Sequence, residues 1–203
     1  GTNASGVGAG GTITYTYASL GSAPSNDFTT AVFQTAVTNR NGNVAEYRFN
    51  HQGNIVRQIQ FTRGLRQGEP PGFTNQFEYN RDGETTRRIN PEGDSVENTY
   101  DSANSDRFQQ GNLLQVRHLP GPRGGDQTQL LTTYSYEPLF NQVRTMTDSR
   151  GNDPAYVPPN GGAQSAGRYT RTNFYDYQES AVAPAEAAAW GITIPPALLG
   201  LGD

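Results

Sequence analysis

The chain has 203 residues and a net charge of −4, and hydrophobic residues make up 33% of it. This share is low for a globular protein, but 24 Gly, 13 Pro and 10% aromatic residues favour many short strands and turns over disorder. The mild charge, with no basic block, argues against nucleic-acid binding. The lack of Cys excludes disulfides and thiolate metal sites. No apolar run is long enough to span a membrane as a helix.

In chain order, the Gly-rich residues 1–11 are expected to form a linker. Alternation of large apolar residues with Thr predicts a first strand over 12–18, and a second is predicted over 30–38 after a Ser/Pro/Gly loop. Loops are expected over 63–73 and 151–167, where Gly and Pro accumulate. The same alternation predicts further strands over 44–49, 55–61, 77–79, 85–89, 96–100, 113–119, 134–136, 143–147 and 169–177.

A four-residue turn motif separates several of these strands: an Asn or Asp, two variable residues and a Gly. The side chain of Asn or Asp bonds to the backbone two residues on, and Gly supplies a positive φ. Neighbouring copies leave room for a single strand between them, so we expect tandem antiparallel hairpins and an all-β fold. The five copies are Asn39 to Gly42, Asn50 to Gly53, Asn80 to Gly83, Asn90 to Gly93 and Asp148 to Gly151.

Around these turns the chain resembles the YD repeat of the RHS family, whose core reads Tyr-x-Tyr-Asp-x-x-Gly-x-Leu. The copies lie at 47–55, at 77–83, at 98–101 with an expanded turn, at 134–143 as a variant and at 174–177 as a partial repeat. The resemblance covers residues 12 to about 178. The aromatic residues that recur in it are Tyr47, Phe49, Phe77, Tyr79, Tyr100, Tyr134 and Tyr136.

The resemblance implies a wide antiparallel sheet of hairpins that spirals into a hollow shell. The family includes polymorphic bacterial toxins, the cocoon component of insecticidal toxin complexes and animal teneurins. In its toxin members, the shell encloses a C-terminal effector. We therefore expect a structural segment of a large bacterial protein, secreted or exposed at the cell surface. Its expected partners are the remainder of its own longer chain or neighbouring copies, and nucleic acid is not among them.

This organisation divides the chain into a linker (1–11), a YD-repeat β-sheet region (12–178) and an Ala/Pro-rich extension (179–203). Within the extension, Pro184 at a first helical position, an Ala run and Gly191 at the end predict a short helix. Some shells of the family carry a self-cleaving aspartyl site. Only its Asp-Pro pair is present here, so this activity is not expected.

Candidate chemical groups are few. His51 and His118 are the only histidines and lack the convergent ligands of a metal site. The segment from Asp101 to Asp106 resembles a calcium loop, but Ala103 and Asp106 break the required spacing. We therefore expect no cofactor, no metal and no catalytic residue. The carboxylates that a glycosidase would need are expected to be solvated side chains in or near turns: Glu78, Asp82, Glu84, Glu92, Asp94 and Glu97.

The tyrosines leave one alternative open, an extracellular module that binds glycans or a neighbouring cell surface. Such a module predicts a row of exposed aromatic residues on one face. Residues that recur at one place in a repeat more often pack between strands, and this favours the structural hypothesis. An enzyme acting on polysaccharide is a third hypothesis, and it requires two carboxylates that face each other across a cleft.

Overall fold

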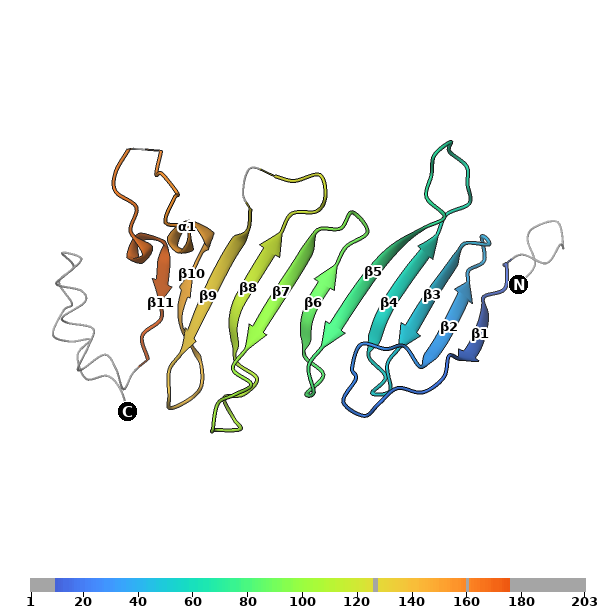
Figure 1. Cartoon of the computed structure of the whole chain (residues 1–203), viewed down its shortest axis with the longest axis horizontal. Helices are drawn as coiled ribbons and strands as arrows, with labels where there is room; N and C mark the ends of the chain where they lie inside the picture. The colour runs from blue at the N-terminus through green and yellow to red at the C-terminus, as the bar shows by residue number, and fades with distance from the viewer. Residues whose placement is uncertain (1–9, 126–127, 160, 176–203) are drawn as a thin grey trace. The chain divides into compact units, whose positions relative to one another are not determined.

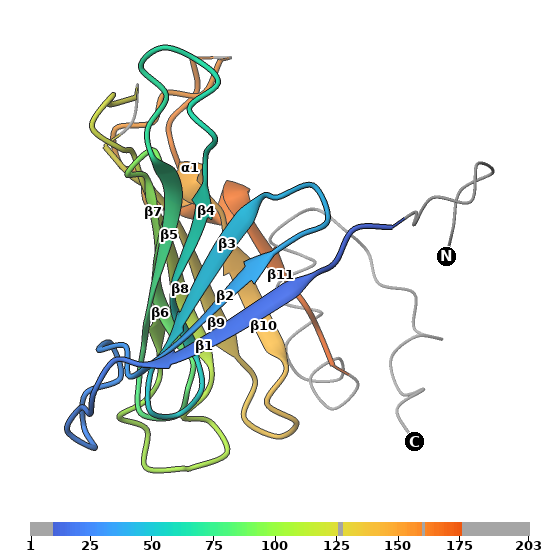
Figure 2. The same cartoon turned by 90° about the vertical axis from the view of Figure 1, so that its right-hand side faces the viewer.

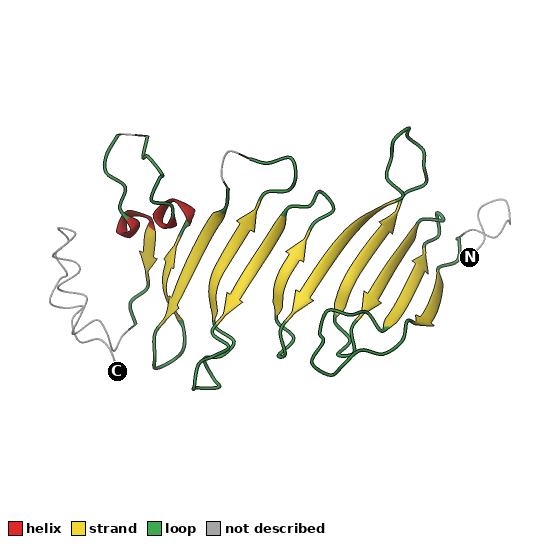
Figure 3. Cartoon of the chain, viewed as in Figure 1, coloured by secondary structure: helices red, strands yellow, loops and turns green. Residues whose placement is uncertain are grey.

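The computed structural model describes residues 10–125, 128–159 and 161–175. These residues form eleven β-strands, one short α-helix and one 3-10 helix, and the strand order in the sheet follows the chain order. Figure 3 shows strands joined by loops, with helix confined to two short segments. The prediction of an all-β fold of antiparallel hairpins is confirmed. Most of the predicted linker and the helix predicted after Pro184 lie outside the described residues.

The chain divides into two compact units, one made of Gly1–Asp101 and Gln115–Leu130, the other of Ser102–Leu114 and Leu131–Asp203. The first unit contains β1 (Thr14–Ser19), β2 (Phe33–Thr38), β3 (Val44–Phe49), β4 (Ile55–Phe61), β5 (Gly72–Tyr79), β6 (Thr85–Ile89), β7 (Ser95–Tyr100) and most of β8 (Leu113–Leu119). The second contains most of β9 (Leu130–Tyr136), then β10 (Val143–Thr147), α1 (Ser149–Asn152), the 3-10 helix Ala166–Tyr169 and β11 (Thr170–Thr172). Figure 1 shows the strands β1 to β7 side by side.

The strand register gives the first unit two chemically different faces. Directly opposite residues of an antiparallel pair lie on the same face of the sheet. One face, here called the aromatic face, carries Tyr15, Tyr17, Phe33, Tyr47, Phe49, Phe73 and Phe77. The other, here called the charged face, carries Glu46, Arg48, Arg57, Glu78, Arg87 and Glu97.

A β-bulge recurs at the same place in three hairpins. Each hairpin has a first strand and a second strand, here called the return strand. The aromatic residue that ends the first strand lies opposite the first residue of the return strand. The second residue of the return strand has no residue opposite it and forms the bulge. The pairs that flank the bulge on the turn side are Phe49–Ile55, Tyr79–Thr85 and Tyr136–Val143. A bulge interrupts the ladder of backbone hydrogen bonds beside it.

Little apolar surface is buried. Among the described residues, the buried hydrophobic side chains are Val32, Val56 and Ile59. Tyr15 and Tyr17 remain 54% and 75% exposed. Figure 2, which shows β1 to β3 of the first unit from the side of β1, shows these strands as one layer. Contacts between neighbouring strands therefore hold this sheet, without a thick core.

Several element boundaries differ from the prediction. β5 begins at Gly72, inside the predicted loop 63–73, because its residues pair with the long β4 as far as Phe61. β9 begins at Leu130, four residues before the predicted start, and β2 begins at Phe33. The last strand was predicted over 169–177, but β11 covers only Thr170–Thr172: the 3-10 helix takes Tyr169, and residues 173–175 are not in a strand. Residues 176 and 177 lie outside the described residues. Two short helical segments, α1 and the 3-10 helix, lie partly within the loop that was predicted over 151–167.

Candidate functional site

The turn motif between β3 and β4 shows how its residues act. The Asn50 Oδ1 accepts hydrogen bonds from the backbone N–H groups of Gln52 and Asn54, at 3.0 and 2.9 Å. Gly53 has a φ of 85°, which is strained for other residues. Asn50 is fully buried, and its Nδ2 donates to the Phe28 carbonyl at 2.7 Å. This side chain therefore closes the turn and fixes the loop that precedes β2.

Other copies keep this geometry in part. The amide oxygens of Asn39 and Asn80 each accept two backbone N–H groups. Asn90 instead donates its Nδ2 to an Asp94 carboxylate oxygen at 2.6 Å, and its own Oδ1 is buried without a hydrogen-bond partner. The glycines that end these three copies all have positive φ: Gly42 at 77°, Gly83 at 80° and Gly93 at 85°.

The fifth copy is a helical turn, and the expected positive φ at Gly151 is wrong. Asp148 is the N-cap of α1, and its carboxylate accepts from the backbone N–H groups of Arg150 and Gly151. Glycine is required there by close packing, since a Cβ at Gly151 would lie 2.5 Å from Thr147 Cγ2.

The turn between β9 and β10 uses a glutamate that the sequence analysis missed. Glu137 is 1% exposed, and its carboxylate accepts from the backbone N–H groups of the next turn residues at 2.8–2.9 Å. Asn141, with a φ of 56°, takes the place of Gly. Asn141 and Asn112 also exchange two amide hydrogen bonds, at 2.6 and 2.9 Å. The signal was present in Tyr136-Glu137, where Glu replaces the Asn or Asp of the motif.

Among the described residues, four tyrosines connect successive hairpins, and we call them the hairpin-bridging tyrosines: Tyr79, Tyr100, Tyr136 and Tyr175. Each hydroxyl donates to the carbonyl of the first residue of the return strand in the preceding hairpin. The acceptors are Ile55 at 2.8 Å, Thr85 at 3.2 Å, Leu113 at 3.1 Å and Val143 at 2.9 Å. Three of these acceptors lie directly beside a recurring bulge, where the backbone ladder is interrupted.

Burial changes the acidity of two of these hydroxyls, those of Tyr79 and Tyr100. Desolvation raises the pKa of Tyr79 above its ordinary value, against a smaller opposing effect of a hydrogen bond with Thr85. Desolvation also raises the pKa of Tyr100, with a further contribution from the negative charge of Glu84. Both side chains remain neutral donors at neutral pH. The remaining recurring aromatic residues are half-buried in their strands: Tyr47, Phe49, Phe77 and Tyr134.

Charges alternate across four neighbouring strands on the charged face; we call Glu78, Arg87, Glu97 and Arg117 the charge ladder. Arg87 lies between the two carboxylates, 3.7 Å from Glu78 and 3.5 Å from Glu97. Arg117 continues the series, 3.7 Å from Glu97. Their side chains are one-third to two-fifths exposed, so each pair stabilises the sheet only weakly.

The other candidate carboxylates also have structural partners. Glu84 accepts from the Asn80 amide at 2.6 Å, and Glu92 pairs with Arg123 at 2.8 Å. Asp106, at the end of the segment compared with a calcium loop, accepts from the backbone N–H of Phe108. In the described part of the chain, no three His, Cys, Asp or Glu residues gather as a metal site would require. The His51 ring packs edge-on against Phe28, with ring centroids 5.5 Å apart.

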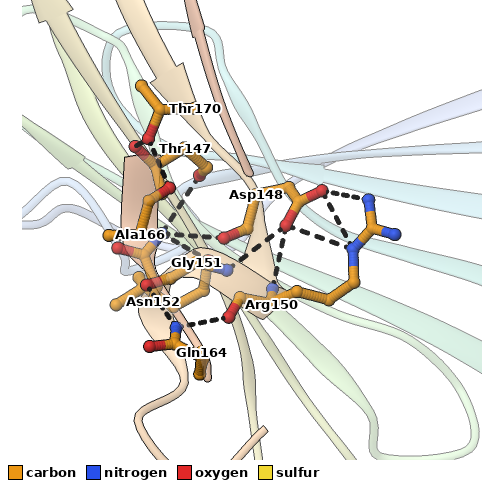
Figure 4. Close-up of polar contacts among 9 residues, drawn as sticks. Thr147, Asp148, Arg150, Gly151, Asn152, Gln164, Ala166 and Thr170 are labelled. Atoms are coloured by element: carbon orange, nitrogen blue, oxygen red, sulfur yellow. Dashed lines mark hydrogen bonds and ion pairs between the residues drawn. The ribbon is translucent and has the colours of Figure 1, made fainter. Parts of the chain in front are cut away.

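A cluster of polar contacts lies around α1 in the second unit, and Figure 4 shows it. The Asn152 Nδ2 donates to the carbonyls of Leu131, Thr147 and Asp148. Arg150 pairs with Asp148, which lowers the pKa of this carboxyl. Gln164 adds hydrogen bonds to the carbonyls of residues 150 and 151. These groups satisfy one another, so the cluster joins α1 to the strand before it.

Comparison with protein-family models and with curated proteins finds no match to this chain. Within the residues that the structure covers, no helix has the length and apolar character needed to cross a membrane.

Proposed function

We propose that the chain is a structural segment of the β wall of an RHS/YD-repeat protein, secreted or exposed at the bacterial cell surface. Its work is mechanical: it encloses or displays other parts, such as an effector. The remainder of a longer chain and neighbouring copies are its partners. The role is not enzymatic.

The recurrence of the hairpin-bridging tyrosines carries this proposal. Tyr79 and Tyr100 each bond one hairpin to the preceding one through a carbonyl beside the turn. Such a device depends only on the neighbouring repeat, so it can extend a sheet indefinitely without enlarging a core. The carboxylates bind neighbouring side chains in turns and strands: Glu84 accepts a hydrogen bond from Asn80, and Glu97 pairs with Arg87. These structural contacts fit a wall better than a catalytic cleft.

The wall of a closed shell has an enclosed side and an outer side. We place the charged face on the enclosed side because this face exposes few apolar groups. The experiment uses two adjacent residues of β5, Thr74 on the charged face and Asn75 on the aromatic face. In the intact protein isolated from its source, a bulky maleimide should label Asn75→Cys and spare Thr74→Cys. Equal labelling of both variants in the native particle would reject an enclosing wall.

A glycan-binding role remains a second proposal because of one observation. Tyr15, Tyr17 and Phe33 are 54%, 75% and 54% exposed on the aromatic face, and exposed aromatic patches commonly mark interaction sites. On a glycan array, this role predicts a hit that Phe33→Ala abolishes and that Phe61→Ala, at an exposed position on the charged face, retains. A chain that binds no glycan on such an array excludes the proposal.

A further inference from the structure

The outer edge of the first unit is formed by β1, which pairs with β2 along one side (Figure 1 and Figure 2). All six of its residues are exposed. In an antiparallel edge strand, alternate residues point their N–H and C=O groups away from the sheet. Within the described residues, β1 therefore presents unpaired backbone donors and acceptors along its outer side.

This edge lacks the features that usually protect edge strands. Short length, Pro, charged residues and bulges are the usual protection. β1 contains no Pro and no charge, its register with β2 is regular from Thr14 to Ser19, and the first charged residue of the chain is Asp27. The strand β11 differs, since it has three residues and carries Arg171.

The side chains of β1 suit a second strand. Tyr15 and Tyr17 project from the aromatic face, and Thr14 and Thr16 from the opposite one. Aromatic and β-branched residues favour extended structure. Cross-strand aromatic pairs and Thr–Thr pairs are among the favourable pairs in antiparallel sheets.

We propose that β1 pairs antiparallel with β1 of a second copy of this chain, about a two-fold axis perpendicular to the sheet. This axis keeps the aromatic faces of both copies on the same side. The centred register then places Thr16 opposite Thr16 of the second copy, and Tyr15 opposite Tyr17 of the second copy. Because the strand carries no charge, self-pairing brings no like charges together. This pairing does not depend on the proposed wall function, and it can be correct even if the wall function is wrong.

The oligomeric state of the full chain provides the first test. Light scattering during size exclusion should give the mass of a dimer that dissociates on dilution. Thr16→Lys places two ammonium groups opposite each other, so this variant should be monomeric at low salt and recover dimer as salt increases. The control Gln60→Lys adds the same charge at an exposed position of β4 and should remain dimeric. A monomeric wild-type chain, or a Thr16→Lys variant that is dimeric at low salt, would overturn the proposal.

Cysteine cross-linking tests the register, since the chain contains no Cys. Under mild oxidation, Thr16→Cys should form a disulfide-linked dimer. The control Thr14→Cys lies on the same strand and face, but it would lie opposite Ala18 of the second copy. The two substituted positions would then be about 14 Å apart along the strand, beyond the roughly 7 Å limit for Cα atoms of a disulfide. Equal cross-linking in both variants, or none in Thr16→Cys, would reject the centred pairing.

Discussion

The Tyr79 hydroxyl donates a hydrogen bond to the Ile55 carbonyl at 2.8 Å, although 24 residues separate them in the chain. Ile55 opens the return strand of one hairpin, and Tyr79 closes the first strand of the next. The bond therefore joins two hairpins at the turn end. Its recurrence at three further places makes it the repeating contact of this sheet.

Removing this hydroxyl should destabilise the sheet measurably. Tyr79→Phe leaves the ring in place and deletes one part-buried hydrogen bond, so we expect a loss of about 1 kcal/mol in the free energy of unfolding. Tyr47→Phe is the matched control, because Tyr47 is half-buried in the same sheet and its hydroxyl forms no hydrogen bond within the described structure. Urea unfolding measures both. An equal loss in the two variants would show that the hydroxyl bond contributes nothing specific.

The buried turn residue Asn50 should be more sensitive than its exposed counterpart Asn39. Asn50→Ala removes two turn hydrogen bonds and the one to the Phe28 carbonyl. Since buried groups would lose their partners, we expect a cost of about 2 kcal/mol or more. Asn39→Ala removes only the turn bonds at an exposed site and should cost about 1 kcal/mol or less. Similar losses of stability in the two variants would contradict the role given to the hydrogen bond between Asn50 and the Phe28 carbonyl.

Glycine substitutions should separate backbone strain from close packing. Gly53→Ala places a side chain at a φ of 85°, which should cost about 1 kcal/mol. Gly151→Ala has helical backbone, where Ala is normally favoured, but its Cβ would lie 2.5 Å from Thr147 Cγ2. It should therefore destabilise, and Thr147→Ser should relieve part of that loss. A Gly151→Ala variant that is more stable than wild type would contradict the close contact between Gly151 and Thr147.

The charge ladder should contribute little, and its contribution should depend on salt. Glu97→Gln leaves Arg117 without its carboxylate partner and Arg87 with one fewer. We expect a loss of roughly 0.5–1 kcal/mol at low ionic strength, which disappears at high salt. Glu92→Gln, which breaks a highly exposed pair with Arg123, should have no measurable effect. A loss at Glu97 that persists at high salt would point to packing instead.

Alkaline pH should weaken the sheet through Tyr79 and Tyr100. Because burial raises the pKa of both hydroxyls above the ordinary value of 10.0, the folded state keeps protons that the unfolded state releases. Their contribution is complete below pH about 10 and decreases as the pH rises toward the folded-state pKa. The double variant Tyr79→Phe, Tyr100→Phe should lose stability less steeply in this range. Identical slopes for wild type and variant would contradict the assignment.

The alternation of residues and the turn motifs predicted most strand boundaries. They could not predict the contacts between hairpins. β3, β4 and β6 begin and end where alternation and turn chemistry place them. The early start of β5 depends on pairing with β4, a partner that its own composition does not reveal. The acceptor of the Tyr79 hydroxyl is likewise set by the register and by a bulge. At Gly151, the motif was recognised but the Asp148 cap directed the backbone into a helical turn.

Native-state hydrogen exchange of Tyr79→Phe against wild type tests the central claim most directly. If each hairpin is held by its neighbour, the amides of β4 and β5 should lose protection while those of β1 and β2 keep theirs. A uniform loss of protection across all strands of the first unit would indicate one cooperative core and contradict the account.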